Sequence, residues 1–197
     1  MASRNQLNPP PLRTITQFKS KLTGGGARSN LFEVALSFPN IASAPSNVLE
    51  ESRFLVKAAA LPGSTITPLD VAFRGRTLKV AGDRTFESWT ITVINDTDFA
   101  LRSAFENWMN KINRLSNNTG ETDPALYQAD AIVYQLDRDG TTLRSYYFHD
   151  IFPTNMSSIQ LAYENSDSIQ EFTVEMQILW WEAYKGNSND AGGDDIN

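Results

Sequence analysis

The chain has 197 residues, of which 41% are hydrophobic and 20% charged, a composition that fits one globular domain with an ample core. The absence of cysteine excludes disulfides and cysteine-ligated metals, and no apolar run reaches the roughly 18 to 20 residues of a membrane span. The net charge is −6, and residues 31–182 carry 11 basic and 20 acidic side chains. Since nucleic-acid affinity comes mostly from Lys and Arg on phosphates, this acidic body disfavours a nucleic-acid-binding module.

The two ends are predicted to be extended or weakly ordered segments outside a single domain. Residues 1–28 form an N-terminal arm with Pro9-Pro10-Pro11, Gly24-Gly25-Gly26, five basic residues and no acid. Residues 183–197 are small and polar, which indicates a flexible acidic tail. The domain therefore occupies residues 29–182.

The first half of the domain is predicted to consist of strands, because apolar and polar residues alternate along it. The expected strands are Leu31–Phe38, Arg53–Ala60, Leu69–Phe73, Arg76–Val80 and Phe86–Asn95. Arg74-Gly75 stands between two of them and predicts a turn.

One helix is predicted after these strands. Asp96-Thr97-Asp98 supplies side-chain oxygens that can cap its first turn, and Asn117-Asn118-Thr119-Gly120 ends it. Apolar residues recur at intervals of four, three, four and three: Leu101, Phe105, Trp108, Ile112 and Leu115. We expect this stripe to pack against the sheet.

The second half of the domain is again predicted to be strands. Gln128–Leu136 and Thr142–Phe148 flank Asp139-Gly140, a strong hairpin signal. A long final strand, Ile169–Trp181, has an apolar face and a polar face. The apolar face contains Phe172, Val174, Met176, Ile178 and Trp180, and the polar face contains Glu171, Thr173, Glu175 and Gln177. The sequence thus predicts a mainly β fold, an antiparallel sandwich or barrel with one packed α-helix.

No catalytic, cofactor-binding or metal-binding residue is predicted. His149 is the single histidine, and neither a Gly-x-Ser-x-Gly elbow nor a phosphate-binding glycine loop occurs. The carboxylate pairs Asp137/Asp139 and Glu171/Glu175 leave a glycosidase-like hydrolase as a distant alternative. Two acids together in a closed pocket would favour that enzyme.

Several segments, in order, resemble the tail tube protein of T-even-like myophages. The longest is Arg76–Asp96, in which Ala81-Gly82-Asp83-Arg84-Thr85-Phe86 is the most specific part. The others are Ser29–Val34, Lys57–Gly63, Ile151–Asn155 and Trp180-Trp181-Glu182. The resemblance covers roughly residues 29–182 and says nothing about the two ends.

This resemblance implies the phage tail tube and secretion needle fold, and a virion structural protein without cofactor or catalysis. Homohexameric rings would stack inside a contractile sheath, from baseplate to head, and the genome would pass through without specific binding. The implied partners are further copies of the chain and the sheath, baseplate and tail terminator proteins. Assembly would take place in the host cytoplasm, without membrane insertion. A type VI secretion needle protein and a baseplate tube initiator are the alternatives.

The tube interpretation assigns roles to two groups of residues. A polar, negative channel lining would repel phosphate, and the candidates are Glu171, Thr173, Glu175 and Gln177. The candidates for contacts between rings are Phe73, Arg74, Arg76, Asp83 and Arg84. Two points stay open: the acids can equally face external solvent, and Asp83 and Arg84 can pair within one subunit or across an interface.

Overall fold

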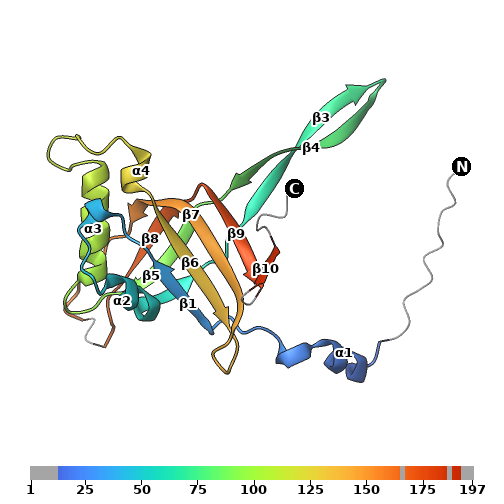
Figure 1. Ribbon diagram of the computed structural model, residues 1–197, viewed down its shortest axis with the longest axis horizontal. Coiled ribbons are helices and arrows are strands. Elements are labelled where there is room, and N and C mark those ends of the chain that lie inside the picture. Colours follow the sequence, from blue (N-terminus) through green and yellow to red (C-terminus); the bar gives the residue numbers. More distant parts are fainter. Residues whose placement is uncertain (1–12, 165–166, 186–187, 192–197) are drawn as a thin grey trace, which may run out of the picture.

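The computed structural model describes residues 13–164, 167–185 and 188–191, and its strands dominate (Figure 1). The strands are β1 Phe32–Leu36, β2 Val56–Ala59, β3 Ser64–Phe73, β4 Arg76–Phe86, β5 Trp89–Ile94, β6 Ala129–Leu136, β7 Thr142–Met156, β8 Glu171–Gln177, β9 Trp180–Lys185 and β10 Ser188–Ala191. The α-helices are α1 Ile15–Lys21, α2 Val48–Leu55, α3 Ala100–Ile112 and α4 Pro124–Tyr127. Short 3-10 turns occupy Thr23–Gly25 and Asn40–Ala42. The mainly β prediction is confirmed.

The long strand β7 belongs to two layers of one antiparallel sheet. Its first part pairs with β6 and β9, and its second part, from Phe152, pairs with β8. Between them Asp150 has a φ of 55°, a left-handed conformation that Asp tolerates better than most residues. The strand therefore turns from the layer β1-β6-β7-β9 into the layer β2-β5-β8-β7, and the core lies between the layers.

The core is closed by aromatic contacts and by α3. The rings of Trp89 and Phe148 stack with centroids 4.3 Å apart. On α3, Leu101, Phe105 and Trp108 are buried, which confirms the apolar stripe up to this point. Leu115 lies beyond the end of the helix and is 93% exposed, so its assignment to the stripe was wrong.

The expected strand Arg53–Ala60 is also wrong in its first half. Residues up to Leu55 belong to α2, which buries Val48 and Ser52 against β1, and the strand begins at Val56. The Ser52 hydroxyl accepts a hydrogen bond from the Leu36 amide at 3.2 Å. The spacing of four between Val48 and Ser52 is helical, but a serine gives no apolar signal in the sequence.

The expected single strand Ile169–Trp181 is two strands. β8 ends at Gln177 and pairs with β5 and β7, whereas β9 begins at Trp180 and pairs with the first part of β7. The chain crosses between layers at Ile178-Leu179. The predicted apolar face ends at Ile178, and the assignment of Trp180 to it was wrong: Trp180 is 39% exposed, whereas Trp181 packs on the core and Ala183 is buried. The core-facing positions therefore change phase between β8 and β9.

The ends of the chain are more regular than the sequence suggested. α1 forms in the arm, with the Thr14 side chain accepting from the Gln17 amide. At the other end β9 continues to Lys185, and Ala183 is fully buried, so regular structure extends past residue 182.

Candidate functional site

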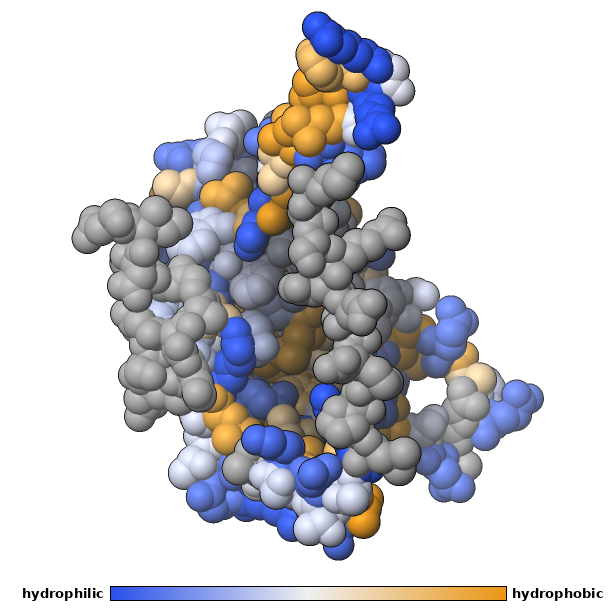
Figure 2. All heavy atoms as spheres, turned by 90° about the vertical axis from the view of Figure 1, so that its right-hand side faces the viewer, coloured by the Kyte–Doolittle hydropathy of each residue, from blue (hydrophilic) through white to orange (hydrophobic). Residues whose placement is uncertain are grey.

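The hairpin β3–β4 projects from the domain and exposes nearly all its side chains (Figure 1). One face is apolar, because Leu69 pairs with Val80 and Val71 pairs with Leu78. These four side chains are 44–62% exposed, and Figure 2 shows the apolar band along the hairpin beneath a hydrophilic tip. A two-stranded ribbon is marginally stable by itself in water, so we expect another protein surface to cover this apolar face.

The tip of the hairpin gathers three of the residues proposed for contacts between rings. Arg74 and Gly75 have φ of 46° and 81°, as in the turns that join tight hairpins, which confirms the predicted turn. Phe73 pairs with Arg76, and the Arg74 guanidinium carbon lies 5.2 Å from the centre of the Phe73 ring. An exposed aromatic ring flanked by two cations thus occupies the far end of the projection.

Asp83 and Arg84, the other two candidates, lie nearer the base of the hairpin, where Arg84 is opposite Ile66. Among the residues that the structure describes, neither forms an ion pair, and the hairpin's ion pair joins Lys79 to Asp70 at 2.8 Å on the polar face. The structure therefore does not bring all five candidates together.

The specific motif around Gly82 has a local physical cause. The two strands shift register between Ile66 and Pro68, which brings the backbone of Thr67 close to Gly82. A Cβ at Gly82 would lie 2.4 Å from the Thr67 carbonyl oxygen, which is closer than atoms can approach. Glycine at this position therefore permits the bulge, and the bulge adds twist to the projecting ribbon.

The second candidate surface is the outward face of the layer β2-β5-β8-β7. On β8, Phe172, Val174 and Met176 are buried in the core. The alternation therefore places the four lining candidates together on the opposite face: Glu171, Thr173, Glu175 and Gln177. Thr90 and Thr92 on β5 lie opposite Glu175 and Thr173, so the hydrophilic face continues across the neighbouring strand.

The charge of this face differs from what the acid count suggested. Lys57 Nζ lies 2.5 Å from Glu171 Oε1, and the Ser88 hydroxyl donates to Glu175 Oε1 at 2.7 Å. Of the two carboxylates, Glu171 is therefore neutralised by a cation. Lys57 was missed because it is two strands away from Glu171, and only the strand order reveals their proximity.

The hairpin and the connection between β7 and β8 lie at opposite ends of this layer. Trp89, at the start of β5 next to the hairpin, pairs with Met176, whereas Ile94, at the end of β5, pairs with Glu171. Because the residues before Glu171 form the connection, the strands separate these two exposed features. The hydrophilic face lies between them.

Enzyme-like features are weak in the part of the chain that the structure describes. Three surface hollows in this part of the chain are each lined by at most one carboxylate. No described group of three His, Cys, Asp or Glu could hold a metal ion, and no described helix is long and apolar enough to cross a membrane. His149 Nε2 lies 3.1 Å from Glu182, and its ring stacks on Trp180, which indicates a packing role.

Tyr134 and Asp139 have shifted pKa values, and neither belongs to a catalytic constellation. Burial raises the pKa of the Tyr134 hydroxyl above its usual range. Hydrogen bonds from the Thr141 hydroxyl and amide lower the pKa of Asp139 at the β6–β7 turn. The pair Asp137/Asp139 lies at a turn, and the pair Glu171/Glu175 lies on an open sheet face. Neither pair occupies a closed pocket, so the hydrolase alternative gains no support.

Comparison with known proteins agrees with this architecture. Residues 27–184 match the family described as phage tail tube protein. Over 161 residues the chain is 34% identical to the tail tube protein gp19 of Enterobacteria phage T4, which covers 81% of this chain and 93% of that protein. It is 26% identical to the tail tube protein of Serratia phage KSP90 over 85% of this chain and 96% of that protein.

Solved structures show the same fold. A chain of the anti-feeding prophage baseplate, solved with 6-fold symmetrisation, aligns with a TM-score of 0.59 at 15% identity, over 81% of this chain and 96% of that chain. A chain of the sheath–tube complex of an extracellular contractile injection system aligns with a TM-score of 0.54 at 13% identity, over 88% and 99%.

Proposed function

The chain belongs to the phage tail tube protein family, and on that premise we propose that it forms homohexameric rings that stack into the inner tube of a contractile phage tail. The family is one of structural proteins, so the chain is a component of the virion and not an enzyme. The observation that carries the proposal is a hydrophilic sheet face with a projecting, unpartnered apolar hairpin at one end.

Ring formation is supported by the edge of the layer β2-β5-β8-β7. In the described chain, β2 pairs with β5 on one side, and its other edge has no strand partner. Unpaired edges promote aggregation unless they are covered, and closing them between subunits produces a barrel without edges. The proposed ring places the hydrophilic face of each copy on the inside of that barrel, as the channel lining.

Ring stacking is supported by the hairpin. Its apolar face cannot be buried by the thin ribbon itself, so a neighbouring ring supplies the missing contact. The tip residues Phe73, Arg74 and Arg76 extend furthest from the domain and are proposed to reach that ring together with Asp83 and Arg84. The exposed Asp83 and Arg84 are free of ion pairs to described residues, which favours pairing across the interface.

The channel is proposed to conduct the genome without binding it specifically. Polar hydroxyl and amide groups dominate the lining, and Glu175 forms no ion pair with another residue that the structure describes. The cation on this face, Lys57, is paired with Glu171, so the surface offers phosphate groups little to bind. The outer surface of the tube would meet the sheath, and its two ends would meet the baseplate and the tail terminator.

The family favours this role over the alternatives of a secretion needle protein or a baseplate tube initiator, because the relative at 34% identity is itself a tail tube protein. Assembly is proposed to occur in the host cytoplasm before incorporation into the virion.

Negative-stain electron microscopy of the purified protein, dilute and concentrated, tests the proposal. The expected result is hollow rings or tubes of uniform bore. Compact monomers at every concentration, even with tail baseplates added as nuclei, would refute the tube role.

A further inference from the structure

The N-terminal helix α1 lies apart from the domain, before the residues 27–184 that match the family (Figure 1). Ile15 and Phe18 of α1 and its C-cap residue Leu22 are spaced to share one face, and they are 70%, 60% and 44% exposed. An isolated helix of 7 residues is marginal in water even with a capping box. Within the described residues, this apolar face is therefore left without a packing partner.

The charges around α1 restrict what that partner can be. Residues 1–30 carry five basic side chains and no acid, and Lys19 and Lys21 lie in the last turn of α1. Conversely, residues 145–184 of the same sequence carry six acids and neither Lys nor Arg. One copy of the chain thus offers both members of a complementary pair.

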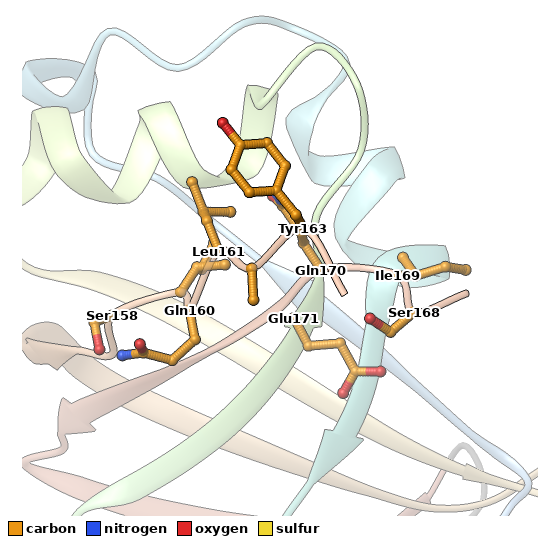
Figure 3. A pocket seen from close by; sticks show the side chains of 10 residues that line it. Ser158, Gln160, Leu161, Tyr163, Ser168, Ile169, Gln170 and Glu171 are labelled. Atoms are coloured by element: carbon orange, nitrogen blue, oxygen red, sulfur yellow. The ribbon is translucent and has the colours of Figure 1, made fainter. Parts of the chain in front are cut away.

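The acidic segment contains an exposed hollow of about 560 Å³ in the connection between β7 and β8, lined by polar and apolar side chains in similar measure. Residues 158–163 and 168–171 line it, and Leu161, Tyr163 and Ile169 are 77%, 108% and 71% exposed. In Figure 3, Leu161 and Tyr163 point to one side of the connection and Glu171 points to the other. Apolar side chains left this open gain stability when another surface covers them.

Carboxylates accompany this hollow. Glu164 and Asp167 are exposed beside it, and neither forms an ion pair with another residue that the structure describes. These two carboxylates give the hollow a negative rim, whereas Glu171 is paired with Lys57. An amphipathic helix with two lysines matches such a site in both apolar surface and charge.

We propose that α1 of one copy docks onto the hollow of a second copy. Ile15 and Phe18 cover Leu161 and Tyr163, while the lysines of α1 lie beside the acidic rim. Helix and hollow occupy different regions of the fold, so each copy can donate one and receive the other, as in repeating head-to-tail assemblies. The inference rests on the proposed assembly of identical copies, and it gives the arm a role in linking them.

Cysteine cross-linking of full-length protein tests the contact, because the chain has no native cysteine. One chain carries Phe18→Cys and a second, of different tagged mass, carries Tyr163→Cys. After mixing, assembly and mild oxidation, we expect about tenfold more mixed disulfide than with Leu115→Cys as the exposed control, because docking raises the effective thiol concentration. Lys19→Glu with Lys21→Glu should lower the yield, and Glu164→Lys with Asp167→Lys in the partner should restore it.

Microscopy of the same samples separates the inference from the proposed function. Tubes with a mixed disulfide yield no higher than the control overturn the docking of α1 and leave the tube role intact. The docking is equally overturned if Phe73→Cys, at the hairpin tip, reacts with Tyr163→Cys in place of Phe18→Cys. Cross-linking without tubes supports the docking and counts against the tube, and the absence of both results overturns both proposals.

Discussion

Lys57 on β2 and Glu171 on β8 form a salt bridge of 2.5 Å that spans the intervening strand β5. Both side chains are partly exposed, so the pair contributes at most about 1 kcal/mol to folding. Its larger consequence is for the charge of the sheet face. Glu175, which accepts a hydrogen bond from Ser88, is then the carboxylate on β8 that would repel phosphate groups from this face.

The charge of the proposed channel is tested most simply at Glu175. Glu175→Lys in assembled tubes should retain short linear duplex DNA at low salt and release it as salt rises, because a ring of lysines would line the channel. Cosedimentation of tubes with labelled DNA measures this. Circular DNA is the control, since it cannot thread a channel from its end. Equal retention of both forms would put Glu175 on the outside.

The apolar face of the hairpin should be required for stacking and not for folding. Leu78→Asp places a charge on that face, whereas Thr77→Asp places the same charge on the opposite face of β4. We expect Leu78→Asp to abolish tubes and Thr77→Asp to preserve them, as seen by sedimentation. Both positions are exposed, so the unfolding free energy should change by no more than about 0.5 kcal/mol. Tubes of normal length from Leu78→Asp would exclude this face from the interface.

The packing of α3 on the sheet can be measured by chemical denaturation. Phe105 is fully buried, with its ring centroid 5.1 Å from that of Phe38 and 6.5 Å from that of Phe172. Phe105→Ala should lower the unfolding free energy by about 3–5 kcal/mol. Leu115→Ala, beyond the helix, should change it by less than about 0.5 kcal/mol. Similar losses for both variants would restore Leu115 to the core.

The β6–β7 turn gives a pH prediction. The Thr141 hydroxyl donates to Asp139 Oδ1 at 2.7 Å and the Thr141 amide donates at 2.9 Å, and together they lower the pKa of this carboxyl. A lowered folded pKa means that the contribution to stability is present above the unfolded pKa and is lost as pH falls through the folded value. NMR titration should show Thr141→Val raising the pKa of Asp139. An unchanged pKa would remove the hydroxyl as its main cause.

Sequence patterns predicted the strands that alternate against one core, together with the turns at Gly75 and Gly140. These patterns failed where one local sequence is compatible with two different secondary structures. Ser52 is buried on the inner face of α2 but is polar, so the sequence lacked the apolar spacing that would have predicted this helix. In the sequence the apolar alternation runs on past Ile178 to Trp180, although Trp180 does not face the core, so one strand was expected where the chain changes layers.

The candidate surfaces were predictable to a similar extent. Alternation alone placed Glu171, Thr173, Glu175 and Gln177 on one face of β8. The partner of Glu171 was not predictable, because Lys57 is 114 residues away in sequence and adjacent only through strand order. The length of the hairpin was underestimated as well, since Pro68 and Gly82 interrupt the strand pattern at the bulge between its two halves.

The most direct test of the tube assembly is a cryo-electron microscopy reconstruction of tubes formed by the full-length protein. The expected reconstruction has six subunits per ring, the outward face of β2-β5-β8-β7 lining the channel, and the β3–β4 hairpin contacting the next ring. Another ring symmetry, or a channel lined by the layer that contains β1 and β6, would contradict it.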